Sequence, residues 1–441
     1  MTRYLSKHEQ IFLDLENDIQ TGKLTKGDKL PSIRKLAETY ACNKDTVQRA
    51  LLELRHHNLI YVRNKSGYYV LGQDKAINDD WDFTRDLEPD KLSPYDDFQK
   101  CLNESLVGRE AYLFNTSSTN QGLPQLSLSL QNLLADYHVY CKPADIVVTS
   151  GTQQALYILS QMTFPNHHQT ILLEQPTYHR MNALVKSQNL PYETVTRTPQ
   201  GLDMAELEQL FASQTIKFFY TIPRLHNPLG TSLSKAEKTK LLELAERYDV
   251  YIIEDDYMAD FDSSHASPLH YFDQSDHVIY LKSFTTTIFP ALRMAAAVLP
   301  TVLRQTFLDY KNLMDYDSNF IMQKALSLYL DNGMYKKHRD QLVKGHRDKI
   351  QDLQALLKKY SLATDVVLSD CKICLPANQV KKDHLKFYFE PDQLLRHAYI
   401  TPNPLDYFQL NLNKKDKDAL DQQLSRYFAK SRRTRLVKAD Q

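Results

Sequence analysis

The sequence predicts a multidomain protein in which a small domain of helices and one β-hairpin precedes a large α/β body. Apolar residues recur at helical spacing over the first 54 residues, and residues 59–71 then alternate as in paired strands. Between residues 145 and 299, short runs rich in β-branched and aromatic residues alternate with helical segments. A chain of 441 residues is long enough to bury the cores of two or three domains.

The composition is that of a soluble globular protein, with 42% hydrophobic and 24% charged residues. The 54 basic and 54 acidic residues cancel, so no global field attracts a polyanion or a membrane. Residues 1–72 differ, because 12 Lys and Arg oppose 8 Asp and Glu there, a net charge of +4. No apolar run approaches the roughly 18 residues needed to cross a bilayer, and the first ten residues, MTRYLSKHEQ, are polar. We therefore expect no membrane partner.

The five Cys are odd in number and scattered, which fits a reducing cytoplasmic location. Cys371 and Cys374 form a single CxxC, with no second pair and no His nearby at ligand spacing. The pattern favours two strand positions over a zinc site, so we expect no metal.

The first domain contains three helical segments followed by a hairpin. Residues 8–20 have helical spacing, and Ser32 follows Pro31 as the N-cap of a second helix. Residues 45–54 form a third helix after a tight turn, and residues 59–71 are typical of a hairpin. A helix, a helix-turn-helix and a two-stranded wing in this order make a winged helix-turn-helix.

The stretch LPSIRKLAETYACNKDTVQRALLELRHHNLIYVRNKSGYYV resembles the DNA-binding domain of the GntR family. Arg and Lys neutralise phosphates, Gln pairs with adenine, and Gly lets the wing approach closely. The alternative for any one of the residues is a solvated charged face. One recognition helix and one wing read half a site, so a dimer on a repeated double-stranded DNA site is expected. The resemblance implies the following DNA-binding residues: Ser32, Arg34, Lys44, Thr46, Gln48, Arg63, Lys65, Ser66 and Gly67.

Residues 73–80 are polar and aperiodic, which predicts a linker between a domain at 1–72 and a body at 81–441. Helical segments at 153–162 and 235–248 separate the apolar runs, which predicts a mainly parallel sheet covered on both faces. We place a large subdomain at about 110–310 and a small C-terminal one at about 320–430. The expected strands are 145–149, 170–173, 217–221, 250–253, 278–281 and 294–299.

The rest of the body is organised around VIYLKSFTTTIFPALRMAAAVLP at residues 278–300, two apolar strands flanking a turn of small hydroxyl residues. This stretch resembles the F-S-K-T-x-F-P-x-x-R motif of fold type I aminotransferases, whose Lys forms a Schiff base with pyridoxal 5'-phosphate (PLP). Thr286 occupies the position of that Lys. A Schiff base needs a primary amine, which a hydroxyl does not supply.

The body as a whole resembles the aminotransferase-like domain of MocR/GabR regulators, which implies an α/β PLP-transferase-like fold. Gly151 opens a helix after a strand, and backbone amides at such a helix start suit the PLP phosphate. Arg293, with Ser283 or Thr285, matches further phosphate contacts. The effector-pocket residues implied by the resemblance, together with Thr286, are Gly151, Thr152, Gln153, Tyr178, Arg180, Asn227, Asp255, Tyr257, Ser283, Thr285, Arg293 and Gln409.

The resemblance also assigns roles around the PLP ring. Tyr178 in EQPTYHR matches the aromatic side chain that stacks on the ring, and Arg180 matches a carboxylate-binding Arg. Asn227 and Tyr257 match contacts to the ring 3-oxygen. Asp255 matches the partner of the ring nitrogen, where a carboxylate keeps the nitrogen protonated. The alternative for each residue alone is a structural role in a turn, a cap or the core.

Two departures from the family pattern set the functional expectation. Besides Thr286, Gln409 in YFQLNLN stands where an Arg normally binds the substrate carboxylate, so a charge-assisted contact is lost. Lys282 shares strand parity with Thr286, but it lies about 13 Å away along an extended strand, too far to replace the Lys.

We therefore expect a DNA-binding transcription regulator whose body forms a head-to-tail homodimer and senses a small molecule without catalysis. PLP or a PLP–amino acid adduct would bind non-covalently, or another effector would take its place, or the pocket would serve only the dimer. The alternative is a PLP-dependent aminotransferase with a vestigial DNA-binding domain.

Overall fold

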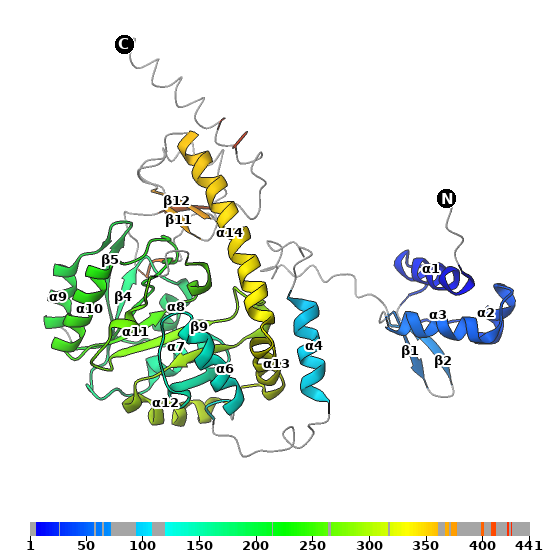
Figure 1. Ribbon diagram of the computed structural model, residues 1–441, viewed down its shortest axis with the longest axis horizontal. Coiled ribbons are helices and arrows are strands. Elements are labelled where there is room, and N and C mark those ends of the chain that lie inside the picture. Colours follow the sequence, from blue (N-terminus) through cyan, green and yellow to red (C-terminus); the bar gives the residue numbers. More distant parts are fainter. Residues whose placement is uncertain are drawn as a thin grey trace, which may run out of the picture. The chain divides into compact units, whose positions relative to one another are not determined.

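The chain forms two compact units, residues 1–85 and 86–441, in the computed structural model (Figure 1). The expected linker at residues 73–80, and with it the boundary between the domains, lies outside the described residues. The structure describes residues 6–25, 27–56, 59–63, 66–71, 94–107, 120–213, 215–262, 266–315, 318–359, 367–369, 372–376, 398–400, 407–411, 421–422 and 425.

The first unit is a winged helix-turn-helix, as predicted. Its strands pair antiparallel, with Ile60 opposite Val70. Apolar residues at helical spacing form the core, and Ile11, Val47 and Leu51 are fully buried. The periodicity therefore identified the buried face of the long helices. The elements are α1 (Lys7–Gln20), α2 (Ile33–Thr39), α3 (Lys44–His56), β1 (Ile60–Arg63) and β2 (Gly67–Val70).

The second unit is built on an eight-stranded sheet of order β3-β10-β9-β8-β7-β4-β5-β6. Neighbours from β9 to β5 run parallel, whereas β10 and β6 are antiparallel to their neighbours. The six expected strands are confirmed to within two residues at each end, while β5 and β6 were not predicted. The strands are β3 (Ile146–Thr149), β4 (Thr170–Gln175), β5 (Tyr192–Thr198), β6 (Gly201–Leu202), β7 (Ile216–Thr221), β8 (Tyr251–Asp255), β9 (Val278–Ser283) and β10 (Ala295–Val298).

Helices cover both faces of this sheet. One face, here called the α7 face, packs against α7 (Thr152–Gln161), α8 (His179–Ser187) and α12 (Thr301–Met314). Successive strand residues alternate between the faces, so Ile253 joins the α7-face core and Ile252 the opposite core. The opposite face, the α10 face, packs against α9 (Met204–Ser213), α10 (Lys235–Arg247), α11 (Leu269–Phe272), α4 (Tyr95–Leu106), α6 (Pro124–Ala135) and α13 (Phe320–Asp331).

Helix α14 (Met334–Lys359) leads from the large part of the body toward a separate three-stranded sheet (Figure 1). That sheet contains β11 (Val367–Ser369), β12 (Lys372–Pro376) and β13 (Tyr407–Asn411). Helix α13 packs against α4 and α6 in the core of the large part, and the expected start of the small subdomain at about residue 320 stays a prediction. Across the described residues, no helix has the length and apolarity to span a membrane.

Candidate nucleic-acid interface and ligand cradle

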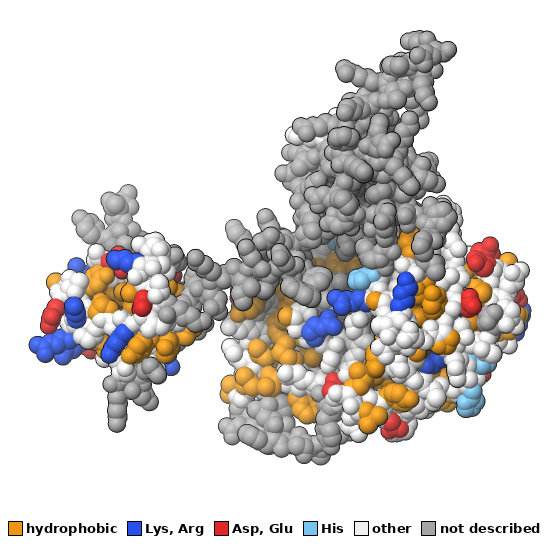
Figure 2. Space-filling model, turned by 180° about the vertical axis from the view of Figure 1, so that it is seen from behind, with side chains coloured by type: hydrophobic (Ala, Val, Ile, Leu, Met, Phe, Trp, Pro, Cys, Tyr) orange, Lys and Arg blue, Asp and Glu red, His pale blue; other side chains and the backbone are white. Residues whose placement is uncertain are grey.

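The expected recognition surface lies on α2 and α3. Lys44 and Gln48 are exposed on α3, and Arg34 is exposed on α2, where its guanidinium lies 3.3 Å from the carboxylate of Glu38. Lys and Arg side chains project from this unit between exposed apolar atoms (Figure 2). The exposed side chains of α2 and α3 are therefore accessible to a polyanion.

Two of the expected DNA-binding hydroxyls have local hydrogen bonds. The Ser32 Oγ accepts from the backbone N–H of Lys35 at 3.3 Å, which makes Ser32 the N-cap of α2. The Thr46 hydroxyl donates to Asn43 Oδ1 at 2.6 Å, and the same oxygen accepts from the Thr46 backbone N–H at 2.8 Å. Both hydroxyls therefore help to begin a helix.

The turn of the wing is braced by tyrosines. The Ser66 and Tyr69 hydroxyls lie 2.6 Å apart, and the rings of Tyr61 and Tyr69 stack with their centroids 5.7 Å apart. Gly67 has φ 117°, a value that residues with a side chain rarely adopt, so the turn requires glycine. The Arg63 backbone ends β1, but its side chain lies outside the description, as does the whole of Lys65.

Lys29 lies beside the wing and was not among the expected DNA-binding residues. It forms an isolated antiparallel bridge with Tyr69. Its exposed side chain crosses the turn, with Cε 3.4 Å from the place where a Cβ on Gly67 would stand. Its Nζ lies 5.9 Å from the centre of the Tyr69 ring. The available signal was a basic residue just before LPS, outside any helical or strand period.

In the body, expected pocket residues gather where β7 and β8 end on the α7 face. Asp255 ends β8 and is only 4% exposed. Its Oδ2 accepts a hydrogen bond from the Tyr220 hydroxyl at 2.8 Å, and its buried Oδ1 has no hydrogen-bond partner among the described residues. Burial raises the pKa of the Asp255 carboxyl to about 6, against the opposing effect of the Tyr220 hydrogen bond. Tyr220 was not among the expected residues.

Tyr178 lies within electrostatic range of this carboxyl, at the start of α8. Its hydroxyl accepts a hydrogen bond from Gln153 Nε2 at 3.3 Å, which links it to the first turn of α7. Burial and the charge of Asp255 raise the pKa of Tyr178, while Arg180 and Arg293 act in the opposite direction. The structure thus brings these expected residues together, with Arg180 exposed on the first turn of α8.

The N-terminus of α7 faces an arginine. Gly151 has φ 82°, and a Cβ built on it would stand 3.0 Å from Arg293 Nη2. The Arg293 guanidinium therefore lies against the start of the helix, where Thr152 begins the first turn and the helix dipole favours an anion. Ser283 is buried, and its Oγ accepts the backbone N–H of Thr285 at 3.2 Å.

The turn that carries Thr286 is tied to the segment that follows β8. The Thr286 hydroxyl donates to the backbone carbonyl of Tyr257 at 3.2 Å, and the Tyr257 hydroxyl donates to the carbonyl of Leu225 at 3.4 Å. Asn227 is half-buried two residues further along that loop. Its neighbour His226 is fully buried, with Nε2 3.3 Å from a carboxylate oxygen of Glu174.

Five of these residues define what we call the cradle: Gly151, Tyr178, Asp255, Thr286 and Arg293. The cradle fits PLP in two respects. The unpartnered Asp255 Oδ1 suits a protonated ring nitrogen, and the turn at Gly151 with Arg293 suits a phosphate. Position 286 carries a hydroxyl and no amine. Gln409 pairs with Cys374 between β13 and β12, and its side chain is not described.

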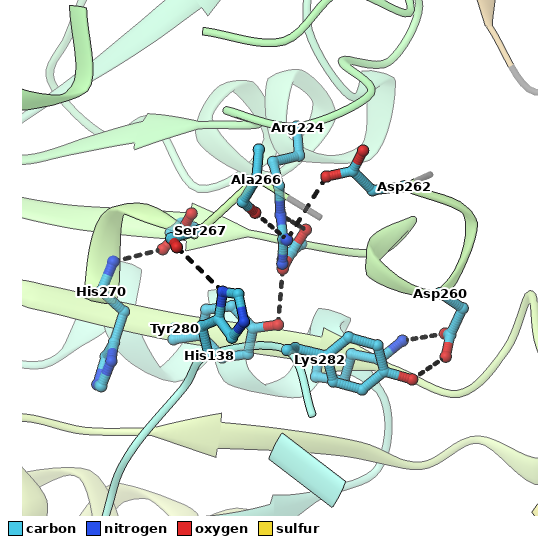
Figure 3. Close-up of polar contacts among 12 residues, drawn as sticks. His138, Arg224, Asp260, Asp262, Ala266, Ser267, His270, Tyr280 and Lys282 are labelled. Carbon is cyan, nitrogen blue, oxygen red and sulfur yellow. Dashed lines mark hydrogen bonds and ion pairs between the residues drawn. The ribbon is translucent and has the colours of Figure 1, made fainter. Parts of the chain in front are cut away.

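Lys282 points away from the cradle. Strand β9 ends at Ser283, so the strand parity with Thr286 that we expected does not extend into the turn. The Lys282 side chain is fully buried, and its ammonium pairs with Asp260 (Figure 3). The same carboxylate accepts the hydroxyl of Thr287 at 2.6 Å. Although burial opposes ionisation, the Lys282 ammonium holds the pKa of Asp260 below its usual value.

A second buried ion pair lies nearby. The Arg224 guanidinium contacts both carboxylate oxygens of Asp256, with Nε 3.0 Å from Oδ1, and donates to the carbonyl of Ala266 at 2.7 Å (Figure 3). The Tyr280 hydroxyl donates to Asp256 Oδ2 at 2.7 Å. Both oxygens of Asp256 thus have donors, whereas Asp255, the preceding residue, has an unpartnered oxygen within the described part of the chain.

A surface cavity of 390 Å³ opens beside the first residue of β9 and the last of β10, away from the strand ends that carry the cradle. Its carboxylates are engaged by the fold, since Asp273 accepts three backbone N–H groups and Asp145 pairs with Arg304. Wherever the chain is described, no group of three or more His, Cys, Asp and Glu is placed to hold a metal.

Known proteins match both units. The family model for aminotransferase class I and II matches residues 95–373, and that for bacterial regulatory proteins of the gntR family matches residues 7–70. The chain therefore belongs to the aminotransferase class I and II family and carries a gntR-type domain before that region.

Two relatives narrow the class of protein to which this chain belongs. The uncharacterized HTH-type transcriptional regulator YcxD of Bacillus subtilis is 42% identical over 365 residues, which cover 81% of each chain. The probable rhizopine catabolism regulatory protein MocR of Rhizobium meliloti is 24% identical over 80% of this chain and 77% of its own. The chain is accordingly a member of a family of HTH-type transcriptional regulators, and in this chain a gntR-type domain precedes an aminotransferase-like domain.

Solved structures agree on the fold of the body. The kynurenine aminotransferase of Pyrococcus horikoshii superposes with a TM-score of 0.64 at 21% identity, covering 76% of this chain and 87% of that one. The multiple substrate aminotransferase of Thermococcus profundus gives a TM-score of 0.66 at 20% identity, covering 77% and 87%. The expected aminotransferase fold of the body is confirmed.

Proposed function

We propose that this protein regulates transcription as a head-to-tail homodimer, binding DNA with its first unit and a small ligand in the cradle, without catalysis. The observation that carries the ligand part is the buried Asp255 oxygen, unpartnered among the described residues, near a turn that offers only a hydroxyl at Thr286. A buried acceptor without a partner costs free energy, which a ligand that donates to it would recover.

For DNA binding, the proposed reading surface is the exposed part of α3 together with the wing. Lys44 and Gln48 supply a charge for phosphate and an amide for a base edge. Lys29 adds a second ammonium beside Gly67 at the turn of the wing. The other proposed contacts are Ser32, Arg34, Thr46, Arg63, Lys65 and Ser66.

For the ligand, different groups would be bound by different residues of the cradle and by Asn227 beside it. Asp255 would hold a protonated ring nitrogen, Arg293 with the α7 N-terminus a phosphate, and Asn227 a ring oxygen. PLP bound there would supply its usual electron sink. The chain offers no amine at position 286 to take up or deliver a proton, and a threonine hydroxyl is too weak a base for that task.

Ligand binding would change the relative populations of two arrangements of the dimer, and thereby the spacing of its DNA-binding units. The turn after β9 would carry this change to α14, and the 3.0 Å distance between the backbone carbonyl of Thr287 and Nε2 of His338 on α14 supports this route. Helix α14 in turn leads to the small subdomain.

DNA binding is tested with the purified protein and the DNA upstream of its own gene. We expect sequence-preferring binding that weakens as salt rises, and Lys44→Ala to lower the affinity about tenfold and the salt slope by about one. Lys23→Ala is the matched control, because Lys23 follows α1 and pairs with Asp18 at 2.9 Å. Equal binding to unrelated DNA would reject the proposal.

The absence of catalysis is tested with the same protein, PLP, and a panel of amino donors and oxo acids. We expect no turnover above that of free PLP in solution. Turnover by the native chain that disappears in Asp255→Ala would show an active aminotransferase and contradict this part of the proposal.

A further inference from the structure

We propose that the cradle prefers the amine form of the cofactor, pyridoxamine 5'-phosphate, over the aldehyde form, PLP. This preference rests on the proposed function, in which the cradle binds a ligand, and it names the chemistry of that ligand. The direction of the Thr286 hydrogen bond carries it.

The Thr286 hydroxyl has one hydrogen and two lone pairs. Its hydrogen is directed to the backbone carbonyl of Tyr257, 3.2 Å away. The lone pairs are then the groups that this exposed side chain presents to its surroundings. Position 286 thus offers a hydrogen-bond acceptor where a lysine would offer an amine.

The Tyr257 carbonyl is held in place by its surroundings. Tyr257 lies two residues after Asp255, and its ring packs against the α7-face core, as the ring of Tyr178 does. Its hydroxyl is bonded to the carbonyl of Leu225. The acceptor at Thr286 is therefore fixed by a carbonyl close to the residue proposed to hold the ring nitrogen.

The two cofactor forms differ at one ring substituent, which is an aldehyde in PLP and an aminomethyl group in pyridoxamine 5'-phosphate. The family's lysine, at the position of Thr286, forms its Schiff base with this substituent. The ring nitrogen, 3-hydroxyl and phosphate of the two forms are the same, so Asp255 and Arg293 would treat both forms alike. The aldehyde oxygen only accepts hydrogen bonds, whereas the protonated amine only donates them. Against the acceptor at Thr286 the amine gains a charge-assisted bond and the aldehyde gains none.

The aldehyde would be favoured if another amine of the motif reached it. Lys282 is the lysine of this motif, and its buried ammonium is paired with Asp260 on the α10 face. A Schiff base to Lys282 would leave the Asp260 carboxylate without its cation, which is costly in a buried site.

The preference is measured by calorimetric titration of the full-length protein with pyridoxamine 5'-phosphate and with PLP in amine-free buffer. We expect the amine form to bind at least about fivefold more tightly. Thr286→Val keeps the shape and removes the hydroxyl, so it should weaken the amine form about five- to tenfold and the aldehyde form less than about twofold. Thr286→Ser, which keeps a hydroxyl, should retain the preference.

A second variant checks where position 286 points. Thr286→Lys should reverse the preference and give a PLP adduct that borohydride fixes, seen as an increase in intact mass. Lys240→Thr, a change at a surface position of α10, should leave both affinities unchanged. A Thr286→Val protein in which both affinities fell equally would indicate a structural role for Thr286 and count against the proposal.

The remaining outcomes distinguish a failure of the ligand preference from a failure of the proposed regulatory function. Equal or tighter binding of PLP to the native chain would overturn the preference. Binding of neither form, with operator binding intact, would also overturn it and leave the DNA-binding function standing. Loss of operator binding in the native chain would instead remove the proposed function on which the inference rests.

Discussion

Two consecutive aspartates at the end of β8 face opposite sides of the sheet and meet different surroundings. On the α10 face, Asp256 is bound by Arg224 and by the Tyr280 hydroxyl at 2.7 Å. On the α7 face, Asp255 accepts the Tyr220 hydroxyl at 2.8 Å and leaves Oδ1 without a partner in the described structure. We therefore assign Asp256 a structural role and propose that Asp255, with its buried unpartnered oxygen, binds a ligand.

Lys282 and Thr286, in the motif at residues 278–300, show the same contrast between a buried paired group and an exposed one. The amine of Lys282 is enclosed on the α10 face by Asp260, and the exposed hydroxyl of Thr286 belongs to the turn beyond the strand. The α10 face therefore holds buried charges that are paired with each other, and the cradle on the other side holds the groups that we propose bind a ligand. Four substitutions, from the largest expected effect to the smallest, test this division.

Removing the buried ammonium should have the largest effect. Lys282→Met keeps the volume but leaves the Asp260 carboxylate buried without a cation, so we expect the free energy of unfolding to fall by about 3–5 kcal/mol in urea titrations followed by circular dichroism. Lys240→Met is the control, because its ion pair with Glu208 is partly exposed at 3.5 Å and should contribute less than about 1 kcal/mol. Similar losses in both variants would contradict the structural role of Lys282.

Neutralising Asp256, whose two carboxylate oxygens both accept hydrogen bonds, should have the second largest effect on stability. Asp256→Asn leaves the buried Arg224 guanidinium facing a neutral amide, and we expect a loss of about 3 kcal/mol in the same titration. Ligand binding in the cradle should persist in the folded variant. A stable Asp256→Asn protein that no longer binds ligand would reverse the roles assigned to the two aspartates.

Neutralising Asp255 should instead raise the free energy of unfolding. The pKa of Asp255 is raised to about 6 in the folded chain from 3.8, so ionisation of this carboxyl destabilises the fold above pH 6. Asp255→Asn should therefore raise the free energy of unfolding by about 2 kcal/mol at pH 8, and the gain should shrink between pH 6 and pH 4. It should also weaken binding of the pyridine ring. Urea titrations across this pH range decide the point, and a pH-independent gain would exclude the titration as its cause.

The smallest expected effect is at the start of α7. Gly151→Ala places a Cβ against the Arg293 guanidinium at a backbone φ of 82°, which should cost about 1 kcal/mol of stability. The exposed Arg293 side chain can move aside, so the variant should fold but bind phosphate-bearing ligands more weakly. Gly333→Ala is the control, since it has a similar φ of 71° and nothing within 4 Å of its Cβ. Equal ligand affinity in both variants would remove the phosphate role of this turn.

Much of the fold could be predicted because its signals are local. Helical spacing located α1 and α3, a Ser after Pro31 located the start of α2, and β-branched runs located six strands of the body. Strands β5 and β6 were missed because Tyr192–Thr198 is largely polar and half-buried, so its pattern resembles a loop. The motif order also predicts, through family resemblance, that Asp255, Gly151 and Thr286 line one pocket, which stays a prediction.

By itself, the sequence determined the order of the domains and the residue at each position of the motif, including a hydroxyl at 286, since both are read from neighbours along the chain. Only the tertiary structure decided on which face of the sheet each charged side chain lies and which group it contacts. Lys282 and Asp260 are separated by 22 residues, and Lys29 lies beside Gly67 because its segment pairs with β2, including the bridge to Tyr69. Periodicity carries no information on such partners, because a side chain's partner is fixed by packing between distant segments.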